Sequence, residues 1–129
     1  MANTYLSRTL AGTRTNGKKW TWSAWVKRNA LNSIQPLFYS DDGSSNYYTT
    51  VRFHDTDSIV FRNKHSSDQG YLITTPVYRD PAAWYHIVAV YDSDNSTSGD
   101  RMILYVNGER ITVYDNEAYP GSSAGSTIN

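Results

Sequence analysis

WYHIVAVYDSDNSTSGDRMILYVNGERITV, residues 84–113, is the stretch that decides the fold. Residues 84–91 alternate with largely apolar side chains on both faces, which is typical of a central strand covered on both sides. Residues 102–106 alternate in the same way, and Asn107-Gly108 follows them directly. Asn-Gly is the strongest short hairpin signal, because a type I′ turn needs positive φ at both central residues. The stretch therefore predicts three antiparallel strands.

The tryptophans of residues 20–28 set the orientation of a further strand. Trp20 and Trp22 fall on one alternating face and Trp25 falls on the other. We expect Trp20, Trp22 and Trp84 to pack in the core, because they lie on faces rich in apolar residues. Trp84 and Val88 are placed inside, so the alanine variant at either position should lower the melting temperature.

Short strands at turn-punctuated spacing, with almost no helix, predict an all-β antiparallel β-sandwich. Pro36 predicts an edge strand or a bulge near its position. The sequence Asp80-Pro81 predicts one turn of helix before residue 84. The remaining predicted strands cover residues 5–6, 34–40, 47–53, 58–62 and 71–75.

The chain length predicts one folded domain, residues 1–120, followed by residues 121–129 as a Gly/Ser-rich tail or linker. Twelve basic residues balance twelve acidic ones, so long-range attraction favours neither nucleic acid nor a membrane as a partner. Cysteine is absent, which excludes disulfides and thiolate metal sites. The sequence has neither the apolar core of a secretory signal nor a run of ~20 apolar residues, so we expect a soluble protein.

Aromatic residues next to polar loops are the first candidates for a binding site. Exposed Trp and Tyr side chains offer flat apolar faces with a polar handle, on which sugar rings can stack. Trp25 faces away from the predicted core, and Tyr47, Tyr48 and Tyr71 border polar loops. These four residues are the aromatic ligand candidates.

Asp41 and Asp42 are the acidic candidates for ligand binding, with a turn as the alternative role. The histidines show no recognised metal-ligand spacing, and residues 92–95 open like a calcium loop without its later glycine and glutamate. Glu109 and Glu117 are the two glutamates, and neither belongs to a motif that places two carboxylates in one cleft. We therefore expect neither metal nor cofactor, and not an enzyme.

Four segments together carry a family resemblance: residues 20–27 (WTWSAWVK), 36–40 (PLFYS), 84–92 (WYHIVAVYD) and 104–109 (LYVNGE). Their order and spacing resemble the laminin G-like, pentraxin-like branch of the concanavalin A-type lectins and glucanases. The start of the chain, residues 4–9 (TYLSRT), is similar to lectin-like domains of phage tail and virion proteins.

This resemblance implies a jelly-roll sandwich that binds a surface glycan or host polysaccharide, in a virion or else in the cytoplasm. It also implies other virion subunits as partners, and the open edge described below predicts a homo-oligomer. Two family features lack a counterpart: the Glu-x-Asp-x-x-Glu catalytic strand, and the second acidic loop that would complete a calcium site with Asp41 and Asp42. A closing C-terminal strand is also missing after Tyr119, so we expect an incomplete sandwich with an open edge. The alternatives are a purely structural assembly module and, less favoured, a polysaccharide-degrading enzyme.

Overall fold

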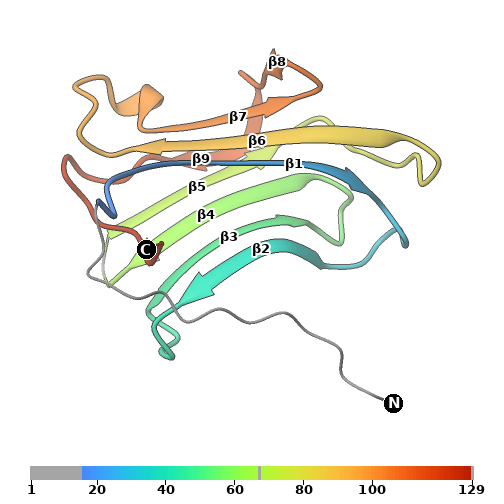
Figure 1. Ribbon diagram of the computed structural model, residues 1–129. Helices are drawn as coiled ribbons and strands as arrows, with labels where there is room; N and C mark the ends of the chain where they lie inside the picture. The colour runs from blue at the N-terminus through green and yellow to red at the C-terminus, as the bar shows by residue number, and fades with distance from the viewer. Residues whose placement is uncertain (1–15, 67, 129) are drawn as a thin grey trace.

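A computed structural model describes residues 16–66 and 68–128, and it is all-β. Two antiparallel sheets face each other, one with strand order β1-β6-β7-β8 and one with order β2-β3-β4-β5-β9 (Figure 1). The elements are β1 (Lys19–Lys27), β2 (Gln35–Asp41), β3 (Tyr47–Phe53), β4 (Ile59–His65), β5 (Asp68–Thr74), β6 (Trp84–Asp92), the 3₁₀ turn η1 (Ser98–Asp100), β7 (Met102–Val106), β8 (Glu109–Arg110) and β9 (Tyr114–Ala118). The predicted β-sandwich is thus confirmed, while residues 5–6 and 4–9 lie outside the described part.

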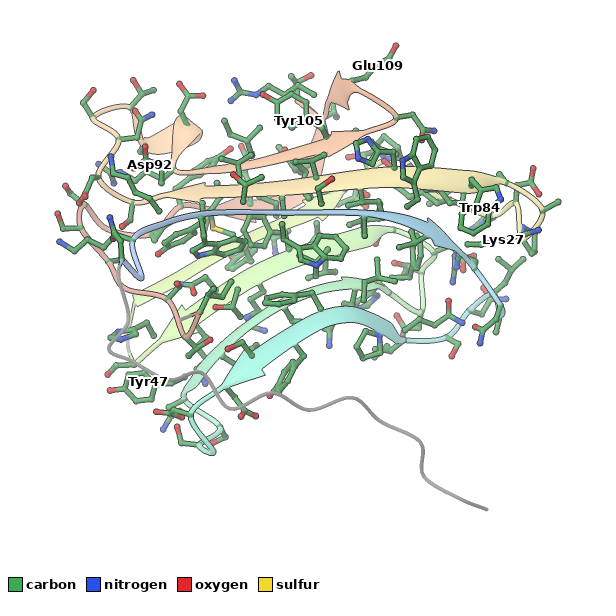
Figure 2. All side chains as sticks on the ribbon, in the orientation of Figure 1. Lys27, Tyr47, Trp84, Asp92, Tyr105 and Glu109 are labelled. Carbon is green, nitrogen blue, oxygen red and sulfur yellow. The ribbon has the colours of Figure 1, made fainter. Side chains whose placement is uncertain are left out.

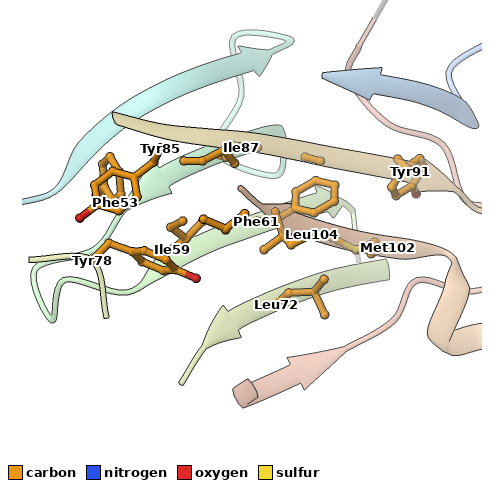
Figure 3. Close-up of a cluster of buried hydrophobic side chains, with 13 residues drawn as sticks. Phe53, Ile59, Phe61, Leu72, Tyr78, Tyr85, Ile87, Tyr91, Met102 and Leu104 are labelled. Atoms are coloured by element: carbon orange, nitrogen blue, oxygen red, sulfur yellow. The ribbon is translucent and has the colours of Figure 1, made fainter. Parts of the chain in front are cut away.

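The core fills the space between the two sheets (Figure 3). The central strands present alternate residues to it, because successive side chains of a strand point to opposite faces. Full burial of a large apolar side chain contributes roughly 1.5–3 kcal/mol, so this cluster is the main source of stability. Its members are Val51, Phe53, Ile59, Phe61, Leu72, Tyr78, Tyr85, Ile87, Ala89, Tyr91, Met102, Leu104 and Val106.

Trp20 and Trp22 pack against this core and Trp25 points away from it, as the alternation predicts. The predictions for Trp84 and Val88 are wrong, because Trp84 is 59% exposed and Val88 lies on the same outward face, outside the core. β6 turns Tyr85 and the other odd-numbered residues inward, and Trp84, Val88 and their even-numbered neighbours face outward. Since both faces of this strand are apolar, its alternation could not show which one the second sheet covers.

Of the three predictions made from turn residues and prolines, two are confirmed and one is wrong. Asn107 and Gly108 have φ of 53° and 86°, as the predicted hairpin turn between β7 and β8 requires. β2 is one of the two edge strands among the described strands of its sheet, and its register shifts between Pro36 and Phe38. Residues 80–83 form a hydrogen-bonded turn, from the backbone N–H of Ala83 to the carbonyl of Asp80, and the predicted helical turn is not formed.

A buried ion pair joins the β1–β2 connection to the β3–β4 turn. Arg28 is 3% exposed and Asp57 is 1% exposed, and Arg28 Nη1 donates to Asp57 Oδ1 at 2.8 Å. The backbone N–H of Asn32 donates to the same oxygen, and Arg79 Nε donates to Oδ2. These donors lower the pKa of the Asp57 carboxyl, the backbone bond from Asn32 most of all. A carboxylate buried with this many donors fixes the position of the turn.

The Gly/Ser-rich stretch after residue 120 is hydrogen-bonded to the rest of the sandwich. Ser93 Oγ donates to the carbonyl of Ala124 at 2.6 Å. Ser40 and Thr127 exchange two hydrogen bonds, each from a side-chain hydroxyl to the other residue's carbonyl, at 2.9 and 2.8 Å. The hydroxyl of Tyr91 in β6 also donates to the carbonyl of Ala124, at 3.2 Å. The stretch is therefore bonded to residues of both sheets, and its role as a separate tail or linker stays a prediction.

Candidate functional site

The six candidate residues fall in three places on the sandwich. Trp25 lies on the outer face of the four-stranded sheet, away from the core. Tyr48 and Tyr71 lie on the outer face of the five-stranded sheet, where their cross-strand partners are Lys64 and Arg62. The remaining three candidates, Asp41, Asp42 and Tyr47, lie at the turn between β2 and β3. No single site contains all six.

The outer face around Trp25, which we term the Trp25 face, is aromatic. Trp25 is 64% exposed and stacks on His86 with ring centroids 4.9 Å apart. His86 is held by a hydrogen bond between Nε2 and Ser23 Oγ at 2.9 Å. Trp84 lies opposite Lys27, and Figure 2 shows the two together at one end of β1 and β6. The exposure of Trp84 adds a second tryptophan that sequence reasoning had assigned to the core.

A depression of about 270 Å³ lies on the outer face of the five-stranded sheet. We term it the β3–β5 depression, since most of its lining comes from those strands and their connections. The strand register brings the lining residues together on one face of the sheet. Arg52 pairs with Val60, Arg62 pairs with Tyr71, and Ile73 pairs with both Val60 and Asn116. The lining residues are Arg52, His54, Val60, Arg62, Tyr71, Ile73 and Asn116.

Aromatic rings surround one of the two arginines of this depression. The guanidinium carbon of Arg62 lies 5.6 Å from the centre of the Tyr48 ring. Tyr48 in turn stacks on Tyr39, with ring centroids 6.0 Å apart, and Tyr39 is 56% exposed. Such cation–π contacts favour a fixed guanidinium position. Tyr48 and Tyr71 are thus brought to the same arginine, Tyr48 by ring contact and Tyr71 by cross-strand pairing.

Sequence reasoning missed Arg52, Arg62 and Asn116 as site residues. The available signal was the alternation in residues 49–53 and 59–63, which places both arginines on the face opposite the apolar residues. The alternation predicts which face of the sheet the two arginines share, but it does not predict that this face has a depression. The depression depends on the register of the strands, which the sequence pattern did not determine.

Asp41 and Asp42 hold the β2–β3 turn. Asp42 Oδ1 accepts the backbone N–H of Ser44 at 2.9 Å, and Asp41 Oδ1 accepts that of Gly43 at 3.3 Å. Hydrogen bonding to Ser44 lowers the pKa of the Asp42 carboxyl. Nearby, Tyr47 packs edge-on against a histidine ring of β4. In the described residues, no group of three or more His, Cys, Asp or Glu side chains could hold a metal ion.

A second depression, of about 280 Å³, is lined by Glu117 together with Gly99, Arg110, Ile111, Thr112, Tyr114 and Tyr119. The hydroxyl of Tyr119 donates to the Glu117 carboxylate at 2.9 Å. Burial, together with this bond, raises the pKa of Tyr119 to about 12. Glu109 belongs to β8 of the other sheet. The two glutamates therefore do not line one depression together.

The comparisons with known proteins identify one family. The laminin G-like family model described as the concanavalin A-like lectin/glucanases superfamily matches residues 2–128. Neither curated proteins nor solved structures gave a match. Within the described residues, no helix is long and apolar enough to cross a membrane.

Proposed function

The chain belongs to the concanavalin A-like lectin/glucanases superfamily, and we propose that it is a non-catalytic, lectin-like module that binds a surface glycan. The observation that carries the proposal is the β3–β5 depression. It combines hydrogen-bonding side chains with the ring of Tyr71, next to the stacked rings of Tyr39 and Tyr48. Sugar sites need this combination, because a pyranose presents hydroxyls at its edge and an apolar face.

The size of the depression suits a terminal or branching sugar unit. Its volume of about 270 Å³ is slightly below the range of drug-sized ligand pockets, which begins at roughly 300 Å³. Asn116 offers an amide that both donates and accepts, and the arginines offer donors only. A single ring with several hydroxyls matches these groups better than an extended apolar ligand.

The proposal excludes hydrolysis because of how the glutamates are placed. Glycosidases that use the common two-carboxylate mechanism hold the pair roughly 5–9.5 Å apart across one cleft. The β3–β5 depression has no carboxylate among its lining residues, and the second depression has only Glu117. A polysaccharide-degrading enzyme would release sugar from its substrate, and Glu117→Gln would have to abolish that release.

We further propose that the module belongs to a phage tail or virion protein and assists attachment to the host surface. The support is the resemblance of residues 4–9 and of the tryptophan strand to lectin-like domains of such proteins. Mass spectrometry of purified particles tests this location. Absence of the chain from particles of the phage that encodes it would contradict it.

A structural module that assembles with other virion subunits, or with a second copy of this chain, is the second candidate. The Trp25 face favours it, because Trp25 and Trp84 are 64% and 59% exposed on one sheet face. Large exposed aromatic side chains clustered on one face are typical of protein interfaces. Light scattering at micromolar concentration tests this: a dimer that Trp25→Ala with Trp84→Ala converts to a monomer supports assembly.

A glycan array separates the two candidates. The lectin hypothesis predicts saturable binding that Tyr71→Ala and Asn116→Ala weaken, Asn116→Ala by about 3- to 10-fold for the loss of one hydrogen bond. Trp25→Ala is the matched control on the opposite sheet and should bind like the parent. Melting curves of all three variants exclude unfolding as the cause. No binding by the folded parent chain would contradict the lectin function and leave the structural one.

A further inference from the structure

We propose that the glycan bound in the β3–β5 depression is acidic, and that Arg52 and Arg62 recognise the carboxylate of a uronic or sialic acid unit. This inference rests on the proposed glycan-binding function and names the substrate class for the same site. It comes from the charge of the lining and from the positions that the strand register gives to the two arginines.

The lining is one-sided in charge. Its seven residues include two arginines and no carboxylate. His54, which also lines the depression, contacts Asp55 through Nδ1 and Oδ1 at 2.5 Å. The whole chain has no net charge, so this local excess of positive charge is a property of the site and not of the surface as a whole. A neutral sugar would not need two guanidinium groups, whereas an anion would gain from both.

The strand register places the side chains of Arg52 and Arg62 next to each other. Arg62 pairs with Thr50, and Arg52 lies two residues further along β3, opposite Val60. The arginines are therefore diagonal cross-strand neighbours on one face, and such neighbours are about 7–8 Å apart, with their Cβ atoms somewhat closer. This spacing allows two planar guanidinium forks to converge on one carboxylate. Apolar neighbours, Val60 and Ile73, strengthen such a contact because they exclude water from it.

Both arginines are partly fixed before a ligand arrives. Arg62 lies over the Tyr48 ring, at 5.6 Å from its centre. The Arg52 Nε atom is buried, and among the described residues it has no hydrogen-bond partner. This burial restricts the movement of the Arg52 side chain. An arginine fork that is already held in place loses less freedom when it binds a carboxylate.

The test is an array of uronic-acid and sialic-acid oligosaccharides, each printed beside its carboxyl-reduced counterpart, followed by calorimetry on the pair with the strongest signal. The parent chain should bind the acidic member at least about 10-fold more tightly. Arg52→Gln and Arg62→Gln should each remove most of that preference, and Arg52→Lys should restore it only in part, because lysine is a point charge without the planar fork. Arg110→Gln, at an exposed arginine of the other sheet, is the matched control and should keep the full preference.

The outcomes separate this inference from the proposed function. Equal binding of the acidic and reduced members overturns the acidic assignment but keeps the glycan-binding function. Binding of neither member of any pair overturns both. Equal binding of a sulfated galactan overturns the choice of a carboxylate. If Arg110→Gln removes the preference for the acidic member and Arg52→Gln leaves it intact, the glycan binds in the second depression. That result overturns the role of Arg52. Melting curves must show that the glutamine variants are folded. If Arg62→Gln is unfolded, the binding preference of Arg52→Gln alone decides the outcome.

Discussion

Substitution of Ser126 by alanine should destabilise the protein, although this residue lies in a Gly/Ser-rich stretch. Ser126 is fully buried, its Oγ donates to the carbonyl of Gly17 at 2.6 Å, and it accepts the indole N–H of Trp20 at 3.0 Å. The alanine variant loses both bonds and leaves the indole donor of a core-packed tryptophan unsatisfied. Two hydrogen bonds contribute about 0.5–1.5 kcal/mol each, so the expected loss is about 1–3 kcal/mol.

Thermal unfolding followed by tryptophan fluorescence measures this loss. For a domain of this length, each kcal/mol corresponds to roughly 4 °C, so the melting temperature should fall by about 4–12 °C. Ser122→Ala is the control, because Ser122 is an exposed serine in the same stretch. If both variants melt at the temperature of the parent, the hydrogen bonds of the stretch contribute nothing to stability, and the sequence-based interpretation as a separate tail is the better one.

Three further experiments test the core, the hairpin and the buried ion pair. Leu104→Ala should lower the free energy of unfolding by about 2–5 kcal/mol in a urea titration, because the side chain is fully buried. Trp84→Ala should lower it far less, because Trp84 is exposed. The reverse order would show that β6 turns its other face to the core. Gly108→Val should lose soluble protein on expression while Gly108→Asn is tolerated, since φ is 86°, and equal yields would contradict the turn. Because the pKa of Asp57 is lowered in the folded state, its ionised form stabilises the protein above about pH 4, and this stabilisation is lost as pH falls through the folded pKa. The melting temperature of the parent should therefore fall from pH 5 to pH 3 more steeply than that of Asp57→Asn, and parallel curves would contradict the role of Asp57.

The sequence allowed much of the fold to be predicted, because strand alternation and turn residues are local signals. Trp20, Trp22 and Trp25 were oriented correctly, since their strand has one apolar and one polar face. Asn107-Gly108 fixed its hairpin through backbone sterics alone. Trp84 was placed wrongly because both faces of its strand are apolar, so its burial depended on where the second sheet packs, and local pattern does not contain that information.

The candidate site was predictable only in fragments. Tyr48 and Tyr71 were identified from their proximity to polar loops, and the structure relates both to Arg62 on one face. Arg52 and Arg62 were not identified, because an arginine on the polar face of a strand looks like an ordinary solvated charge. Only the register of β3 against β4 shows that the two are neighbours.

An NMR titration of the isotope-labelled chain with the acidic oligosaccharide selected on the array tests the central claim most directly. The account predicts that the Nε–H signals of Arg52 and Arg62 and the side-chain amide of Asn116 shift in a saturable way, while the indole N–H signals of Trp25 and Trp84 stay unchanged. Saturable shifts confined to the two indole signals would contradict it, because they would place the glycan on the opposite sheet.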